Sequence, residues 1–176
     1  MVVLAGPALH LLLHVPAGCS TFPARSEQSI LPVSAIVAND APAGVGDDCL
    51  PIVPICGNAE ELQLPDGNSY LWLRGDRAFL LERAAALRST ETTSRPSQGG
   101  LIASLPIGAC SSVSELKRTA ILAWQLHTTY RCRAVVLPWP ELEAAAAAAA
   151  DIGGWDAIAC QLIRMREPEW TVIQGG

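Results

Sequence analysis

Apolar and polar positions along the second half of the chain follow two different periods. Over residues 69–75, Tyr70, Trp72 and Arg74 alternate with two leucines, which is typical of a strand. From Asp76 onward the apolar residues recur at helical spacing instead. The same patterns predict strands over residues 101–107 and 133–139, and helices from residue 113, over 141–151 and over 155–165.

The first half of the chain is predicted to hold shorter elements. Residues 8–15 and 33–37 are apolar and indicate two strands. Residues 49–57 are also apolar, but two prolines favour an edge strand or an extended segment. Residues 19–29 and 58–68 are polar and are predicted to be connections. A last strand is predicted over residues 170–174.

Strands that alternate with helices indicate an α/β fold whose sheet is at least partly parallel. The chain has 176 residues, which suits one domain, and we expect residues 1–176 to form a single α/β domain. No internal repeat and no long linker divides the sequence.

Composition and charge narrow the classes of partner. Half of the residues are hydrophobic and 16% are charged, as in a globular protein. The net charge is −5, the single lysine is Lys117, and the arginines are scattered, which argues against an extended nucleic-acid surface. A small nucleotide is the more plausible anion, since backbone N–H groups at a helix start can bind one.

The cysteines and the N-terminal segment bear on the cellular compartment. Six cysteines occur without a Cys-x-x-Cys pair, which favours free thiols in a reducing, cytoplasmic compartment over a disulfide framework. The apolar N-terminal segment has no basic residue before Arg25, so we do not expect a signal peptide. No segment is apolar for long enough to predict a membrane span.

Two loops of small residues are predicted to follow strands. The first spans residues 39–48 and contains Gly44 and Gly46, which would let a ligand approach the backbone. The second spans Gly108 to Ser112 and leads into a helix through a capping box with Glu115. In α/β folds ligands bind beyond the carboxyl ends of strands, so the two loops could clamp a diphosphate. Small-residue turns before helices are common, however, so either loop taken alone favours an ordinary connection.

Several segments in sequence order resemble the macro-domain family. They are "SAIVAND" with the following "AGVG", "LQLPDGNSYLWLRG", "LIASLPIGACSSVSELKRTAILAW" and "RAVVLPW", and they fall within residues 8–140. The resemblance implies a three-layer α/β/α sandwich with a mixed, partly parallel central sheet. It also implies binding of ADP-ribose or a related nucleotide, with hydrolysis of ADP-ribose linkages in some members, and it implies no cofactor.

The resemblance assigns roles to individual residues. Asn39 would orient the distal ribose and Asp40 would position or activate a water. The first diphosphate loop would comprise Gly44, Val45 and Gly46, and the second Gly108, Ala109, Cys110, Ser111 and Ser112. The family's second loop usually carries two or three glycines, whereas here only Gly108 remains. This departure keeps a second hypothesis open: a non-catalytic structural or interaction protein, with the prolines and Trp139 near residues 138–140 facing a partner.

Other residues suggest weaker candidate sites. Asp40, Asp47 and Asp48 could bind a metal or act as acid and base, or could simply be exposed. His10 and His14 share a face of either a strand or a helix, but no third metal ligand is evident, so no metal site is predicted. Cys110 at a helix start could be nucleophilic, although no base accompanies it. We expect Trp139 to be exposed.

Overall fold

Seven strands and five α-helices account for most of the described chain. The computed structural model describes residues 9–19, 21–39, 50–55, 61–64, 69–89, 98–107 and 112–166. The strands are β1 (His10–His14), β2 (Ala35–Val37), β3 (Ile52–Val53), β4 (Glu61–Gln63), β5 (Ser69–Leu73), β6 (Gln98–Ser104) and β7 (Cys132–Pro138). The helices are α1 (Arg25–Ile30), α2 (Arg77–Ser89), α3 (Val113–Tyr130), α4 (Trp139–Ala148) and α5 (Trp155–Arg166), with a 3₁₀ turn at Ala150–Ile152.

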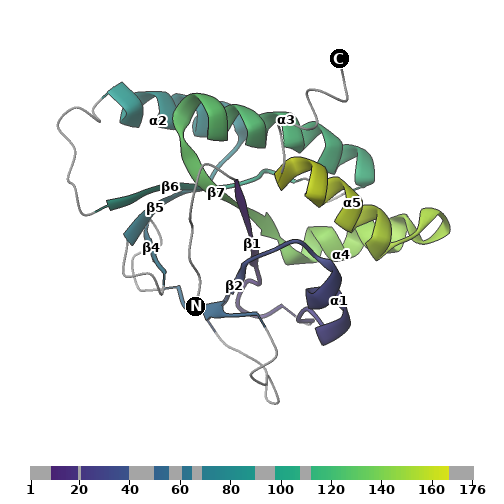
Figure 1. Ribbon diagram of the computed structural model, residues 1–176. Coiled ribbons are helices and arrows are strands. Elements are labelled where there is room, and N and C mark those ends of the chain that lie inside the picture. Colours follow the sequence, from purple (N-terminus) through teal and green to yellow (C-terminus); the bar gives the residue numbers. More distant parts are fainter. Residues whose placement is uncertain are drawn as a thin grey trace.

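The strands form one mixed sheet in the order β3-β2-β1-β7-β6-β5-β4 (Figure 1). Five neighbouring pairs are parallel, and β4 runs antiparallel to β5. The predicted α/β class is therefore confirmed, with a mostly parallel central sheet flanked by helices. Because these strands are parallel, the carboxyl ends of β1, β2, β3, β5, β6 and β7 meet at one edge of the sheet.

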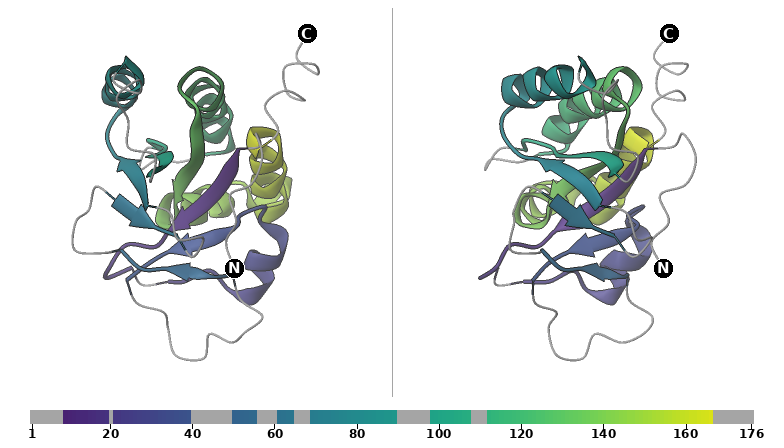
Figure 2. Two further views of the ribbon diagram at one scale, coloured as in Figure 1. Left: turned by 60° about the vertical axis from the view of Figure 1, so that its left-hand side comes forward. Right: turned by 90° about the vertical axis from the view of Figure 1, so that its left-hand side faces the viewer.

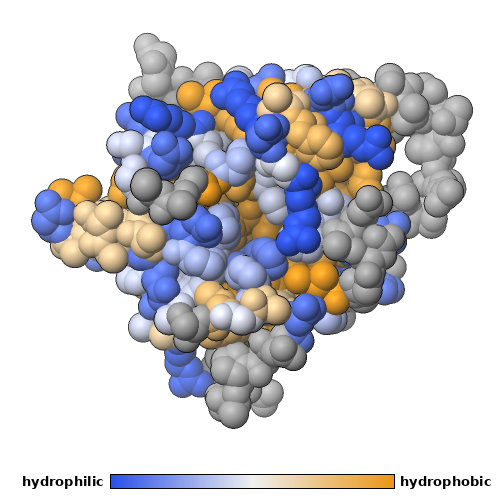
Figure 3. Space-filling model, turned by 180° about the vertical axis from the view of Figure 1, so that it is seen from behind, coloured by the Kyte–Doolittle hydropathy of each residue, from blue (hydrophilic) through white to orange (hydrophobic). Residues whose placement is uncertain are grey.

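Local sequence signals explain where the helices begin and end. The Asp76 carboxylate accepts the backbone N–H of Phe79 at 2.8 Å, and the Ser112 hydroxyl accepts that of Glu115 at 3.3 Å, so both predicted caps are confirmed. The alanine-rich α4 and its 3₁₀ turn end at Gly153 and Gly154, whose φ angles of 118° and 54° favour glycine. This unit projects to one side (Figures 1 and 3).

One helix arises where a connection was predicted. Residues 19–29 contain most of α1, a six-residue helix that has no apolar periodicity of its own. Glu27 accepts the backbone N–H of Ala24 at 2.8 Å and so closes the first turn. The buried Gln28 donates to the Pro23 carbonyl at 2.9 Å and accepts the Leu50 N–H at 2.8 Å. Tertiary hydrogen bonds thus hold a helix that residue propensity alone does not predict.

One strand was also missed within the polar residues 58–68. Glu61–Gln63 pairs antiparallel with β5, and only its central Leu62 is buried. Three residues give too short an alternation to predict a strand by themselves. The turn predicted at residues 65–68 and the strand predicted at 170–174 lie outside the described residues.

The helices pack against one face of the sheet. The crossovers β1–α1–β2, β5–α2–β6 and β6–α3–β7 all step in the same direction across it. Right-handed crossovers that step the same way place their helices on the same face. Accordingly, buried residues of α2, α3, α4 and α5 share one apolar cluster with Leu11, Leu13, Ile36 and Val135 from the strands.

The opposite face of the sheet forms a second apolar cluster. Within the described chain it contains strand and strand-flanking residues only: Leu12, Ala35, Val37, Val53, Leu62, Leu64, Tyr70, Trp72, Ile102, Ala134 and Val136, with Ile55 packed against them. Every residue of the buried set is at most 2% exposed. We call this set of residues the inner cluster. It forms a second core, on the face of the sheet opposite the helices.

The sheet is strongly curled around that inner cluster. The rings of His14 on β1 and Trp72 on β5 lie 5.3 Å apart, although β7 and β6 separate their strands in the sheet. Three strand spacings in a flat sheet span roughly 14 Å. The contact therefore requires curvature, which both views of Figure 2 show, with the helices along the outer side.

The prediction that Trp139 is exposed is wrong. Trp139 begins α4 directly after β7 and is 0% exposed. Its indole stacks on Trp155 at 5.1 Å between ring centroids, and its Nε1–H donates to the Thr21 hydroxyl at 3.1 Å. Trp139 thus belongs to the apolar cluster between the sheet and the helices, which we call the helix-side core. The two flanking prolines had suggested an exposed turn instead.

Exposed apolar side chains are distributed over several elements. The large ones are Ile30, Phe79, Ile121, Trp124, Ile152 and Ile163, from four helices and the 3₁₀ turn. Figure 3 shows apolar and hydrophilic side chains mixed over the face that it presents. The described residues thus do not gather their exposed apolar side chains on a single element.

Candidate functional site

The structure describes two of the ten predicted site residues. Asn39 is exposed and lies two residues beyond the end of β2. Ser112 is the N-cap of α3, which follows β6. Because β2 and β6 belong to the set of parallel strands, both loops leave the sheet at its carboxyl edge. Asp40, Gly44, Val45, Gly46, Gly108, Ala109, Cys110 and Ser111 lie outside the described residues.

A cluster of polar and aromatic side chains occupies the same carboxyl edge on the inner face. His14 ends β1, Ser104 ends β6, and Arg74 directly follows β5. Trp72 lies two residues before Arg74, and both belong to the alternating set predicted from the sequence. We call these four residues, His14, Trp72, Arg74 and Ser104, the strand-end cluster.

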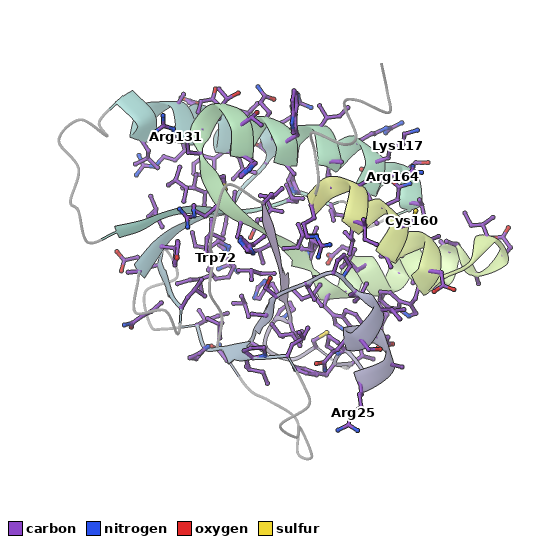
Figure 4. The ribbon with its side chains drawn as sticks, in the orientation of Figure 1. Arg25, Trp72, Lys117, Arg131, Cys160 and Arg164 are labelled. Carbon is purple, nitrogen blue, oxygen red and sulfur yellow. The ribbon has the colours of Figure 1, made fainter. Side chains whose placement is uncertain are left out.

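Trp72 is the fixed centre of the strand-end cluster. Its side chain is 2% exposed, and its Nε1–H donates to the Ser104 hydroxyl at 2.8 Å. Ile102 is its register partner on β6, and Ala134 follows on β7. The small side chain at position 134 leaves volume inside the curled sheet for the indole. Figure 4 shows Trp72 among the side chains in the middle of the strands.

Arg74 lies over the face of that indole. Its Cζ is 3.9 Å from the Trp72 ring centroid, a cation–π contact. A guanidinium stacked in this way keeps its N–H groups at its edges, where they can donate to an oxyanion. Arg74 is exposed to solvent, and within the described residues no carboxylate pairs with it. Burial of part of the side chain lowers the pKa of Arg74, which remains a cation at neutral pH.

His14 contacts the same indole from another strand. Its ring meets Trp72 edge-on, with an interplanar angle of 87°. Burial, and secondarily the charge of Arg74, lower the pKa of His14 from 6.5 to about 4. His14 is therefore neutral at pH 7. Neither ring nitrogen is hydrogen-bonded to another residue that the structure describes.

The cluster is suited to binding an anion. It supplies a cationic fork at the edge of the sheet and a neutral imidazole beside it, both oriented by a buried tryptophan. The protein as a whole has a net charge of −5, whereas no carboxylate of the described residues neutralises Arg74. Within the described residues no hydrogen bond joins the Ser104 hydroxyl to His14, so the cluster shows no serine activated by a base.

The other candidate sites gain no support from the described chain. No group of three His, Cys, Asp or Glu side chains that could hold a metal occurs in it, so His10 and His14 have no third ligand there. Asp40, Asp47, Asp48 and Cys110 lie outside it. Burial raises the pKa of Cys132 to about 12, which makes that thiol a poor nucleophile. No described helix is long and apolar enough to cross a membrane.

Sequence reasoning missed the strand-end cluster, although one signal pointed to it. The alternation that places Tyr70 and Trp72 on one face also places Arg74 there, at the end of the strand. A cation at the carboxyl end of a parallel strand is a binding signal in α/β folds. The contact between His14 and Trp72 has no sequence signal, because it depends on how far the sheet curls.

Comparisons with protein-family models, with curated proteins and with solved structures gave no match for this chain.

Proposed function

We propose that the chain binds a small nucleotide of the ADP-ribose type at the carboxyl edge of its sheet. One observation carries the proposal: the Arg74 guanidinium is stacked on the buried Trp72 and is not paired with a described carboxylate. A guanidinium held in this way is preorganised for a phosphate, since little side-chain entropy remains to be lost on binding. Asn39, at the same edge, is available for a ribose hydroxyl.

The charge distribution favours a small ligand over a nucleic acid. Figure 4 labels Arg25, Lys117, Arg131 and Arg164, which are spread around the outside of the fold. Binding to a nucleic-acid backbone requires many clustered cations. A single oriented arginine in an acidic protein suits a ligand that carries only one or two phosphates.

The resemblance to macro domains supports a more specific proposal, in which the ligand is ADP-ribose or an ADP-ribosylated target. If the chain hydrolyses an ADP-ribose linkage, Asn39 would orient the ribose and Asp40 would activate a water. The described cysteines Cys19, Cys132 and Cys160 are free thiols, which supports the further proposal of a cytoplasmic protein.

Calorimetric titration of ADP-ribose into the wild-type chain and into Arg74→Ala tests the proposal. A charge-assisted hydrogen bond contributes about 1.5–3 kcal/mol, so we expect the variant to bind roughly ten- to a hundredfold more weakly. Arg74→Lys should lie between the two, because lysine keeps the charge but loses the planar fork. Adenosine, which has no phosphate, should bind far more weakly than ADP-ribose.

Arg83→Ala is the matched control. Arg83 is an exposed arginine on α2, away from the strand-end cluster, and its removal should leave the affinity unchanged. No binding to the wild type at millimolar ADP-ribose would favour the structural or interaction protein instead. Equal affinities for wild type and Arg74→Ala would remove the strand-end cluster from the binding site.

A further inference from the structure

We propose that His14 and Arg74 form one oxyanion subsite in which binding of a phosphate or sulfate group is coupled to protonation of His14. The inference rests on the proposed function and adds to it a second ligand-binding residue and a pH dependence of affinity. It also assigns an anion-binding role to a histidine that the sequence analysis considers only as a metal ligand and that the resemblance does not include.

The side chains of His14 and Arg74 both contact the indole of Trp72. The Arg74 Cζ and the His14 ring lie 3.9 Å and 5.3 Å from the Trp72 ring. That indole cannot move easily, because it is buried and hydrogen-bonded to Ser104. His14 and Arg74 therefore contact one fixed indole at the carboxyl edge of the sheet, near enough for the charge of Arg74 to lower the pKa of His14, and both are at least partly accessible to solvent.

Arg74 is the charged side chain that acts on the pKa of His14. The register partners of His14 on the flanking strands β2 and β7 are Val37 and Pro138, and neither titrates. Trp72 on β5 and Arg74 directly after it are the other neighbours, and burial together with Arg74 accounts for the low pKa of His14. Within the described residues, no carboxylate contributes to that pKa. The unliganded site therefore disfavours a second positive charge.

A bound oxyanion reverses this electrostatic balance. Its negative charge offsets that of Arg74 and attracts an imidazolium, so the pKa of His14 rises on binding. One proton passes from solvent to the unprotonated ring nitrogen of His14, which then donates a second charge-assisted hydrogen bond to the ligand. No covalent bond of the ligand is made or broken in this step.

The sign of the pH dependence follows from linkage. Because the bound state holds the proton more tightly than the free state, affinity increases as pH falls toward about 4. If binding restores the pKa of His14 to its ordinary value near 6.5, affinity rises roughly thirtyfold between pH 8 and pH 5.

The experiment is calorimetric titration of wild type, His14→Gln and His127→Gln between pH 5 and pH 8, with ADP-ribose and with inorganic sulfate. Each phosphate of ADP-ribose carries one ester bond and one anhydride bond, so neither has the second ionisation near pH 6 of a phosphate monoester. Sulfate likewise keeps its charge over this range. His127 is the histidine control. Its Nδ1 forms a hydrogen bond with the carbonyl oxygen of Cys132 at 2.8 Å, and Cys132 begins β7, at the opposite edge of the sheet from the strand-end cluster.

We expect wild type and His127→Gln to bind more tightly at pH 5, with uptake of a proton, and His14→Gln to show no such slope. Binding of ADP-ribose that is independent of pH in wild type would overturn the coupling while leaving the proposed function intact. A pH-dependent affinity for sulfate without any for ADP-ribose would support the subsite and reject the nucleotide. No binding of either probe would overturn both proposals.

A spectroscopic readout keeps the test independent of how the variants fold. The chain has three histidines, so the ring protons of His14 can be followed by NMR in the wild type. Saturating sulfate should raise the titration midpoint of His14 from about 4 by at least one pH unit. A midpoint that does not move while sulfate binds would contradict the coupling.

Discussion

Replacing Trp72 with alanine is expected to lower the free energy of unfolding by about 3–5 kcal/mol, the usual cost of truncating a buried tryptophan. The side chain is 2% exposed and fills the inner core between β5 and β1. Its loss removes apolar contacts and leaves a cavity in the inner cluster. Urea denaturation followed by far-ultraviolet circular dichroism measures the change.

Two further variants test whether the loss of stability is specific to the buried indole of Trp72. Trp124→Ala removes a tryptophan that is 36% exposed on α3, and it should cost far less. Trp72→Phe keeps most of the apolar volume but loses the hydrogen bond to Ser104, so it should cost about 1–2 kcal/mol. If Trp72→Ala were no more destabilising than Trp124→Ala, the inner core would not be organised around Trp72.

Trp139→Ala is expected to have an effect of similar size, about 3–5 kcal/mol, from the helix-side core. Trp139 is 0% exposed, and it joins the start of α4 to Trp155 on α5 and to Thr21. Thermal and urea unfolding of the purified variant should both show the loss. Thr21→Val removes the acceptor of the Trp139 N–H together with the hydrogen bond that the Thr21 hydroxyl donates to Glu143, and it should cost about 1–2 kcal/mol.

The Trp139 variant also separates two roles for the prolines and tryptophan at residues 138–140. A residue that faces a partner protein can be truncated without loss of stability in the isolated chain. Unfolding of Trp139→Ala at the same urea concentration as wild type would therefore favour a partner surface. The burial of Trp139 predicts instead that its main contribution is to folding.

Most of the fold could be predicted from the sequence because its longer elements have strong local signals. The caps at Asp76 and Ser112 and the alternation in β5 are local, and the structure confirms all three. The two missed elements, α1 and β4, are six and three residues long. Hydrogen bonds to Gln28 and pairing with β5 stabilise them, and both contacts come from residues outside the element.

The candidate site could be predicted only in part. The carboxyl edge of the sheet follows from the alternation of strands and helices, and the predicted loops begin there. The strand-end cluster does not follow, because His14 and Trp72 are 58 positions apart and meet only through the curvature of the sheet. The twist between neighbouring strands accumulates over the whole sheet, and no short motif encodes the resulting curvature.

A crystal structure of the chain with ADP-ribose tests the central claim, an oxyanion site at the strand-end cluster, most directly. We expect a phosphate oxygen at roughly 2.7–3.2 Å from an Arg74 guanidinium nitrogen, with a His14 ring nitrogen at a similar distance and Trp72 still buried behind them. ADP-ribose bound elsewhere, with Arg74 and His14 contacting only solvent, would contradict it.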